Sequence, residues 1–404
     1  MASTKIEKSI NINDTFLLMH KNIEVCQISF VGDGTVDTVN IYEDNAKYMP
    51  IGSSKDIYSF RQWWANRAIP KTRNNAKPAL EKLGYANTSE VLLNNLALSL
   101  NDCYWIKPSD SSLKWEDVNL FTNDFEDIFG DLTLENNRKV DIKDKTKFNS
   151  ATSPGELQKK WCIGNKSKRI LIKGNYGLSY QQSLNEVFAS NLHSKQSFDN
   201  YVEYTLTNLS LSNNTKGLGC SCYCFCNENV ESISLSSITT LDKKRNDESY
   251  FSFIKKLCLQ LGIKEKEFDD YFDYMILTDF LLTNVDRHLN NISILRNPNN
   301  LEIIGFSPIY DFGNSMFYNT STADFDDIDI YHIKVNSIVD EEMKMLKYVK
   351  NRNAVNLNNL DVDFSIYDND VKENQIRKNH YIEMFNKKRE LLQMFQDGIN
   401  VWKH

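Results

Sequence analysis

The chain has no long hydrophobic run. None of its 404 residues belongs to a stretch approaching the roughly 20 consecutive apolar residues that span a bilayer. The first eight residues also lack the apolar core of a secretory signal. From these absences we expect a cytoplasmic protein that does not act at a membrane.

Clustered positive charge is also missing. The chain carries 47 Lys and Arg against 54 Asp and Glu, a net charge of −7, with an isoelectric point near 5.5. Contacts to nucleic-acid phosphates need clustered Lys and Arg, and no basic run here exceeds a few residues. Direct nucleic-acid binding is therefore not expected as the main activity. The 41% apolar and 25% charged residues are ordinary for a globular protein of two or three domains.

The cysteines lack the spacing of a metal site. Four of the eight alternate along the chain, at positions 220, 222, 224 and 226. On a strand such residues share one face as a row, so they cannot converge on one tetrahedral zinc. Neighbours in the row would also form disulfides of poor geometry. We interpret 220–226 as a buried strand that uses Cys as a small apolar residue, with a metal site as the alternative.

Two short acidic motifs stand near the three-quarter point of the chain. The first, Asn-Val-Asp-Arg-His-Leu-Asn-Asn at 284–291, supplies Asp286 and, five residues later, Asn291. The second, Pro-Ile-Tyr-Asp-Phe-Gly at 308–313, supplies Asp311. An apolar, strand-like stretch separates them. Either motif alone would mean little, but their order and their separation of 25 residues (311 minus 286) are typical of a kinase catalytic centre.

Phosphoryl transfer requires an oriented acceptor hydroxyl, metal ions on the phosphates and positive charge nearby. We predict that Asp286 is the catalytic base and that Asn291 and Asp311 bind Mg²⁺. The structural alternatives are an Asp that caps a turn, an Asn that bonds within its loop and an Asp-Phe-Gly turn without function. Phe312 is expected to pack in the core and His288 to brace the loop. For Arg287, contact with phosphate and pairing with an acid both stay open.

Candidates for the nucleotide phosphates lie upstream. Lys173 ends the apolar strand Ile-Leu-Ile, and Glu186 follows thirteen residues later (186 minus 173) on a predicted helix. Such a Lys–Glu pair places an ammonium on the α and β phosphates of ATP. The alternative is an edge Lys that reaches water beside an exposed helical Glu. Ser153 and Gly155 lie in a turn whose backbone N–H groups could cover the triphosphate.

Periodicity places these motifs on an α+β fold. A β-hairpin is predicted at 24–31 and 36–42, helices between 56 and 99, with a capped start at Ser89, and an irregular segment pinned by aromatic residues at 101–150. Further elements are expected as follows: strands at 161–163 and 169–173, and helices at 181–192, 250–261, 265–282 and 373–402. The acidic run 324–329 is expected to be a solvated loop.

The ordered residues resemble the HipA-like serine/threonine kinases of bacteria. The resemblance rests on Lys173, Glu186 and the string Asn-x-Asp-x-His-x-x-Asn followed by Asp311, and it covers roughly residues 150–320. Segments 63–70 and 98–106 resemble the amino-terminal part of a HipA-like subgroup of Gram-positive bacteria. The family's catalytic loop has Asp-x-His in place of the His-Arg-Asp of eukaryotic kinases.

The resemblance implies a bilobal protein-kinase-like fold. Residues 1–148 would form an additional N-terminal α+β accessory region, 149–235 a small β-rich N-lobe and 236–404 a mainly helical C-lobe. ATP and Mg²⁺ would be the cofactors and a Ser or Thr of a protein the acceptor. In the family a loop Ser can be phosphorylated and shut the enzyme off. Here Ser153, or Thr152, is the regulatory candidate, although the loop matches only partly.

Family members include toxins paired with an antitoxin, so an antitoxin or regulatory protein is an expected partner and a toxin role a further hypothesis. Two alternatives keep the fold. One is a pseudokinase or partner-binding scaffold that holds ATP without turnover. The other is an enzyme that transfers AMP in place of phosphate.

Overall fold

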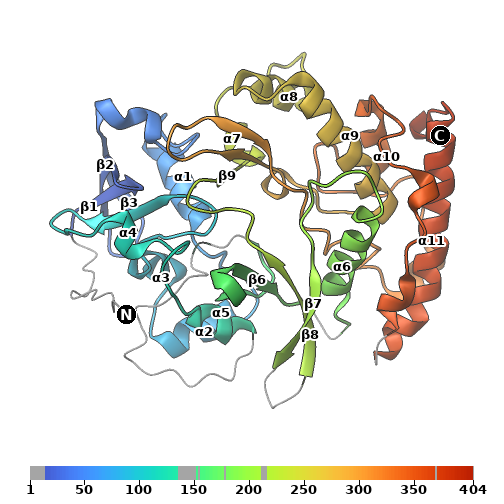
Figure 1. Cartoon of the computed structure of the whole chain (residues 1–404), viewed down its shortest axis with the longest axis horizontal. Helices are drawn as coiled ribbons and strands as arrows, with labels where there is room; N and C mark the ends of the chain where they lie inside the picture. The colour runs from blue at the N-terminus through green and yellow to red at the C-terminus, as the bar shows by residue number, and fades with distance from the viewer. Residues whose placement is uncertain are drawn as a thin grey trace. The chain divides into compact units, whose positions relative to one another are not determined.

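The computed structural model describes residues 14–134, 152, 155–176, 179–210, 216–368 and 371–403. It divides into two compact units (Figure 1). The first comprises Met1–Gly174, Thr207–Ile233 and Arg296–Glu302, and the second Asn175–Leu206, Ser234–Leu295 and Ile303–His404. These units do not follow the predicted domain boundaries at 148 and 235, which stay a prediction.

An antiparallel sheet forms the first part of the first unit, in the order β3-β2-β1-β4. Its strands are β1 (Phe16–His20), β2 (Ile23–Phe30), β3 (Val36–Ile41) and β4 (Tyr104–Pro108). The hairpin predicted from alternation is confirmed as β2 and β3. The expectation that 101–150 is irregular was wrong for β4. That strand pairs with β1, more than eighty residues away, and such long-range pairing leaves no local signal.

Three helices fill the segment predicted to be helical: α1 (Ile57–Arg67), α2 (Ala76–Leu83) and α3 (Thr88–Asn94). Asp56 caps α1 by accepting a hydrogen bond from the Ser59 N–H. Asn87 caps α3, so that helix starts just before the predicted Ser89. Gly84, at φ +71°, ends α2 in the left-handed conformation that glycine adopts most readily.

The aromatic residues of segment 101–125 pack as predicted. Trp105 and Trp115 are buried in one core together with Trp161, and Phe121 and Phe125 pack against it. Two short helices lie in this part of the chain, α4 (Trp115–Val118) and α5 (Ile128–Leu134), so the expectation of an irregular segment was wrong for them as well. The backbone N–H of Trp161 donates to the Asp127 carboxylate at 2.9 Å. A residue of the predicted N-lobe is therefore bonded to a residue of the predicted N-terminal region.

A second four-stranded sheet has the order β5-β6-β8-β7. Its strands are β5 (Lys159–Ile163), β6 (Arg169–Lys173), β7 (Thr205–Ser210) and β8 (Lys216–Tyr223). The predicted pairing of 161–163 with 169–173 is confirmed. The predicted cysteine strand was too long, because β8 ends at Tyr223 where its partner β6 begins, and Cys224 and Cys226 lie beyond it. All eight cysteines are free thiols.

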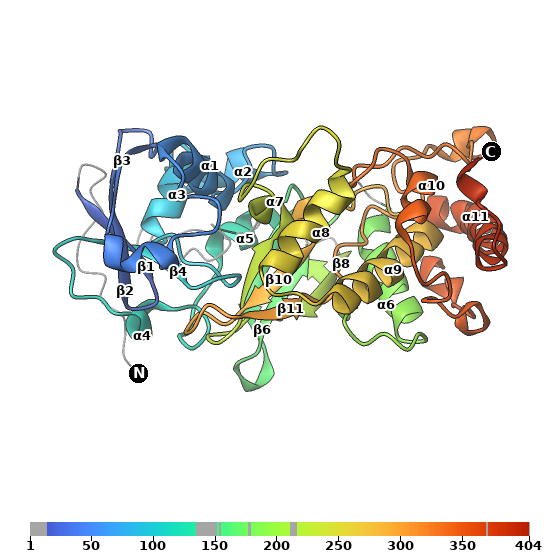
Figure 2. The ribbon, with the colours of Figure 1, turned by 90° about the horizontal axis from the view of Figure 1, so that it is seen from above.

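Helices dominate the second unit. They are α6 (Gln181–His193), α7 (Leu235–Ile238), α8 (Tyr250–Gln260), α9 (Glu265–Leu282), α10 (Glu342–Met345) and α11 (Lys372–Gln396). The long helix α9 packs against both α8 and α11 (Figure 2). The predicted helices at 181–192, 250–261 and 265–282 are confirmed, and the last predicted helix ends at Gln396.

The remaining elements are short. A three-stranded sheet has the order β11-β10-β9, with β9 at Glu231–Ser234, β10 at Ser293–Arg296 and β11 at Ile303–Phe306. Short 3-10 helices lie at Glu43–Tyr48, Asn165–Ser167, Leu289–Asn291, Thr322–Asp327, Leu346–Tyr348, Leu357–Asn359, Phe364–Tyr367 and Val401–Lys403. The acidic run 324–329 is thus not a plain solvated loop, because Phe325 within it is buried.

The α+β class is confirmed by these sheets and helices. In the described part of the chain, no helix has both the length and the apolar character needed to cross a membrane.

Candidate functional site

The first motif follows the end of α9. The helix stops where Thr283 turns to φ +50°. The side chain of Asn284 then bonds in two directions: its Nδ2 donates to Asp279 at 2.8 Å and its Oδ1 accepts from the Asp286 N–H at 3.2 Å. Asn291 closes the loop by donating from Nδ2 to the Asp286 carbonyl at 3.0 Å. The structure therefore brings Asp286 and Asn291 together, as the spacing predicts.

The carboxylate of Asp286 is held by two amides. Asn314 Nδ2 donates to one oxygen and Asn336 Nδ2 to the other, each at 2.9 Å. The two amides orient the Asp286 side chain, which is still 29% exposed. A hydroxyl group can therefore reach this carboxylate from solvent. His288 lies with Nε2 3.9 Å from Asp286 Oδ1. Sequence reasoning missed Asn314 and Asn336, which lie 28 and 50 residues away.

Asp311 adopts a left-handed conformation, with φ +66°. Such a value is uncommon outside glycine and is found at sites where the surrounding structure fixes the backbone. The next residue supplies that constraint. The Phe312 N–H donates to Glu186 Oε2 at 2.8 Å, and the Phe312 ring is 2% exposed. Phe312 therefore packs in the core as expected, and Glu186 holds the Asp-Phe-Gly turn.

Two side chains, Arg287 and His193, contact the Phe312 ring. The guanidinium of Arg287 is 4.6 Å from the ring centroid, and the His193 ring is 4.9 Å from it. Burial, aided by the nearby Arg287 charge, lowers the pKa of His193 to about 3, so this imidazole is neutral at physiological pH. Its Nδ1 bonds with the Tyr274 hydroxyl at 2.8 Å. The ring therefore has one cation over its face and a neutral aromatic partner.

Arg287 joins the two motifs. Its Nε and Nη2 donate to the Asp279 carboxylate at 2.9 and 3.0 Å, and its Nη1 donates to the carbonyls of Asn291 and Tyr310. Burial opposes the charge, but Asp279 outweighs it and raises the pKa of Arg287. Of the two roles left open by the sequence, pairing with an acid is the one observed.

Helix α6 holds the chain that follows Asp311. Asn185 Nδ2 donates to the carbonyls of Gly313 and Ser315 at 2.9 and 2.7 Å. Gln182 Nε2 donates to Asn314 Oδ1 at 3.1 Å, and Asn314 in turn reaches Asp286. The sequence signal for these contacts was a run of polar residues on α6, which the structure buries. The bonding partners of these residues could not be predicted from the sequence.

The predicted nucleotide-contacting residues are placed as follows. Lys173 ends β6 in the first unit and is 5% exposed, whereas Glu186 belongs to the second unit, so their pairing stays a prediction. Gly155 has φ +90°, a conformation that suits glycine. Thr152 is buried, and its hydroxyl donates to the Leu98 carbonyl at 2.9 Å. Ser153 lies outside the described residues.

The donors fit Mg²⁺ in their chemistry. Asn291 uses Nδ2 on the Asp286 carbonyl, which leaves its amide oxygen as the donor, and Asp311 contributes a carboxylate. Mg²⁺ takes hard oxygen ligands and is bound by one or two protein groups together with phosphate oxygens and waters. Within the described ranges no group of three or more His, Cys, Asp or Glu side chains could hold a metal without such help.

Comparison with known proteins gives likenesses in structure only. No protein-family model matches the chain, and no curated protein matches it in sequence. The chain is similar to the proinflammatory kinase CtkA of Helicobacter pylori, at 17% identity and TM-score 0.45, over 59% of this chain and 90% of CtkA. It is also similar to HipA of the Shewanella oneidensis MR-1 toxin–antitoxin system, solved with HipB and operator DNA. That likeness has 10% identity and TM-score 0.49, over 95% of this chain and 100% of HipA.

Proposed function

We propose that this chain is an ATP- and Mg²⁺-dependent protein kinase that phosphorylates Ser or Thr of a protein substrate. One observation carries the proposal: two amide donors fix the Asp286 carboxylate, and Asn291 of the same loop bonds with the Asp286 carbonyl. A carboxylate that is oriented and partly exposed can accept the proton of a substrate hydroxyl.

The remaining residues support the same chemistry. Arg287 donates to one carbonyl within each motif, so the loop of Asp286 and Asn291 and the turn of Asp311 are fixed to each other within one unit. Mg²⁺, held by Asn291 and Asp311, would neutralise charge on the phosphates of ATP. Lys173 would bind the phosphates that are not transferred. Glu186 would then have two roles: it accepts the hydrogen bond from the Phe312 N–H, and it would pair with Lys173 as predicted.

The test is transfer from labelled ATP by the purified full chain with Mg²⁺, using dephosphorylated casein as acceptor. Asp286→Ala and Asp311→Ala should each lower the rate by about 10²–10⁴-fold while the protein stays folded. Asp270→Ala is the matched control, because Asp270 is an exposed acid on α9. Full activity in both site variants would show the proposal to be wrong.

The position of the label separates the alternatives. Label in the γ-phosphate should appear on protein, and label in the α-phosphate should not. The reverse result would indicate transfer of AMP. Binding of ATP without any transfer, to casein or to proteins of a cell extract, would indicate a scaffold.

The acceptor and partner form a finer part of the proposal. HipA of Shewanella is solved with HipB and operator DNA. By analogy we propose that this chain has a protein antitoxin and inhibits growth through its kinase activity. Expression of the intact chain, but not of Asp286→Ala, should then slow growth, and phosphoproteomics of the two cultures would identify the acceptor. Equal growth inhibition by the intact chain and by Asp286→Ala would show that toxicity does not depend on phosphoryl transfer.

A further inference from the structure

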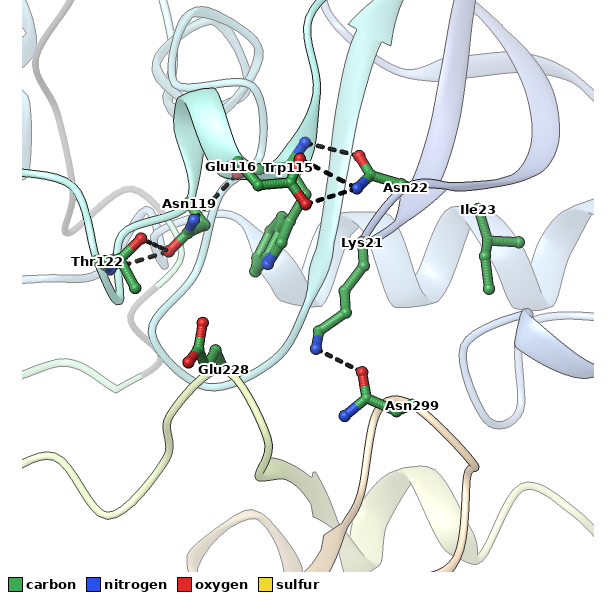
Figure 3. Close-up of a pocket in the computed structure, with 9 residues that line it drawn as sticks. All are labelled: Lys21, Asn22, Ile23, Trp115, Glu116, Asn119, Thr122, Glu228 and Asn299. Atoms are coloured by element: carbon green, nitrogen blue, oxygen red, sulfur yellow. Dashed lines mark hydrogen bonds between the residues drawn. The ribbon is translucent and has the colours of Figure 1, made fainter. Parts of the chain in front are cut away.

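A second candidate site lies in the first unit and shares no residue with the phosphoryl-transfer site. It is a cavity of about 400 Å³, within the size range of small-ligand pockets. Its walls come from the turn between β1 and β2, from α4 and the residues after it, and from two later turns (Figure 3). The lining residues are Lys21, Asn22, Ile23, Trp115, Glu116, Asn119, Thr122, Glu228 and Asn299.

Polar bonds fix the walls. Asn22 Nδ2 donates to both oxygens of Glu116, at 2.8 and 3.1 Å, and Asn22 Oδ1 accepts from the Trp115 N–H at 2.8 Å. The Lys21 carbonyl accepts from the indole of Trp105 at 2.8 Å. Across the pocket, Lys21 Nζ donates to Asn299 Oδ1 at 2.7 Å. Two chain segments nearly three hundred residues apart thus meet here in a defined geometry.

One donor that lines this pocket bonds with no described residue. Trp115 is 4% exposed, and none of the hydrogen bonds among the described residues uses its indole N–H. Figure 3 shows the indole pointing into the space between Lys21 and Glu228. The indole N–H reaches the open space of the pocket, so an occupant can accept a hydrogen bond there that no described residue accepts.

The charges in the pocket select the occupant. The pocket is lined by two carboxylates, Glu116 and Glu228, and by one ammonium, Lys21, whose Nζ already bonds with Asn299. The Glu228 carboxylate forms no hydrogen bond or ion pair with any described residue. An anion such as phosphate would meet the two carboxylates, and an apolar group would leave these polar walls without partners. A planar cation with several N–H donors meets both demands.

We propose that this pocket binds an arginine side chain within a peptide segment of a protein partner. The guanidinium donates to Glu228 and to the outer lone pairs of Glu116, and a backbone carbonyl of the same peptide accepts from the indole of Trp115. Arginine is enriched at protein interfaces for this bidentate pairing. Asn299 lies in the turn between β10 and β11, so an occupant also contacts the hairpin that links the two motifs in the chain.

The experiment follows the Trp115 indole directly. In the ¹⁵N-labelled full chain, the indole N–H signals are resolved and that of Trp115 is assigned by its loss in Trp115→Phe. Titration with acetyl-Gly-Arg-Gly-amide should move the Trp115 signal in a saturable way and leave the other indole signals in place. The same peptide with citrulline, which keeps the shape and removes the charge, should not move it.

Two variants of matched chemistry sharpen the test. Glu228→Gln should weaken binding of the arginine peptide by about two- to fivefold, the range for one exposed ion pair. Glu81→Gln removes an exposed carboxylate from α2, away from the pocket, and should change nothing. A Trp115 signal that stays fixed, equal binding of the citrulline peptide, or an unchanged affinity in Glu228→Gln would each overturn the proposal. Movement of the Trp115 signal by inorganic phosphate, without any movement by the arginine peptide, would also overturn it.

Discussion

Each of the two units contains a buried arginine paired with an acid, and the two pairs differ in what else they hold. Arg287 in the second unit is 1% exposed and bonds with Asp279. Arg296 in the first unit is 4% exposed and bonds with Glu231 at 2.6 Å. The chemistry of the pair is therefore the same in both places.

The remaining donors set the two arginines apart. Arg287 donates from Nη1 to the carbonyls of Asn291 and Tyr310, which belong to the two motifs. Arg296 donates to the Tyr104 hydroxyl at 3.0 Å, and its partner Glu231 also bonds with His20 and the Cys103 N–H. The first pair fixes loops that bear partly exposed carboxylates, and the second closes a buried polar cluster. We infer that one serves activity and the other only stability.

The largest expected effect comes from removing each arginine. Arg287→Met and Arg296→Met both leave a buried carboxylate without its guanidinium, and each should lower the free energy of unfolding by about 3–5 kcal/mol. Only Arg287→Met should abolish phosphoryl transfer in protein that is still folded. Urea denaturation measures the total, and hydrogen exchange assigns the loss to one unit. Arg245→Met, at a side chain 72% exposed, should change stability by less than about 0.5 kcal/mol. Loss of transfer in folded Arg296→Met would break the comparison.

The next effect is on the pH dependence of stability. Burial favours a raised pKa for Glu231, but the hydrogen bonds and charges of His20 and Arg296 outweigh it and lower the pKa to about 2, from 4.5. A lowered carboxyl pKa stabilises the folded state above the unfolded value, and this contribution is lost as pH falls from about 4.5 to 2. It is on the order of 3 kcal/mol.

Denaturation of the wild type and of Glu231→Gln between pH 2 and 7 would measure this contribution. The wild type should lose stability more steeply below pH 4.5, because Gln does not titrate. Equal slopes for the two proteins would contradict an ionised Glu231 in the folded cluster.

A smaller effect is expected at the two amides that orient Asp286. Asn314→Ala and Asn336→Ala each remove one hydrogen bond to a charged group, and each should lower kcat by about tenfold. The loss should be greater for Asn314, because Gln182 fixes it to α6, whereas Asn336 is exposed. KM for ATP should change little. Steady-state kinetics would measure both constants, and a matching fall in stability would point to a structural role alone.

The smallest effect on activity is expected in the closed cluster. Tyr104→Phe removes a hydroxyl that donates to the Tyr48 carbonyl at 2.9 Å and accepts from Arg296. The free energy of unfolding should fall by about 2 kcal/mol, because two hydrogen bonds of roughly 1 kcal/mol each are lost. Thermal or urea denaturation measures this change, and kcat should stay at the wild-type value. A fall in kcat would connect this cluster to activity and remove the distinction between the two arginines.

Local patterns predicted most of the helices and two hairpins. The 3.6-residue repeat of 265–282 gave α9 with its observed bounds, and alternation gave β2 and β3. The failures were contacts between distant segments. Strand β4 exists through its pairing with β1, and the cysteine strand stops at Tyr223, near the first residue of its partner β6. The neighbouring residues mark neither the existence of β4 nor the end of the cysteine strand.

The candidate site divides in the same way. Asp286, Asn291 and Asp311 were predicted because a metal-dependent kinase needs these residue types in that order, within two short loops. Asn314, Asn336 and Asn185 were not, because the chain is rich in asparagine and nothing local marks the ones that reach Asp286 or the turn after Asp311. Glu186 was chosen for a pairing that stays a prediction, and the structure shows it bonded to Phe312.

The sequence by itself determined the α+β class, the order of the motifs and the residue types available for phosphoryl transfer, since each depends on neighbours within a few positions. Only the tertiary structure decided which amides orient Asp286, which acid neutralises Arg287 and how the buried cluster around Glu231 closes. The physical reason is the short reach of a hydrogen bond. It acts over about 3 Å in space, whatever the separation along the chain.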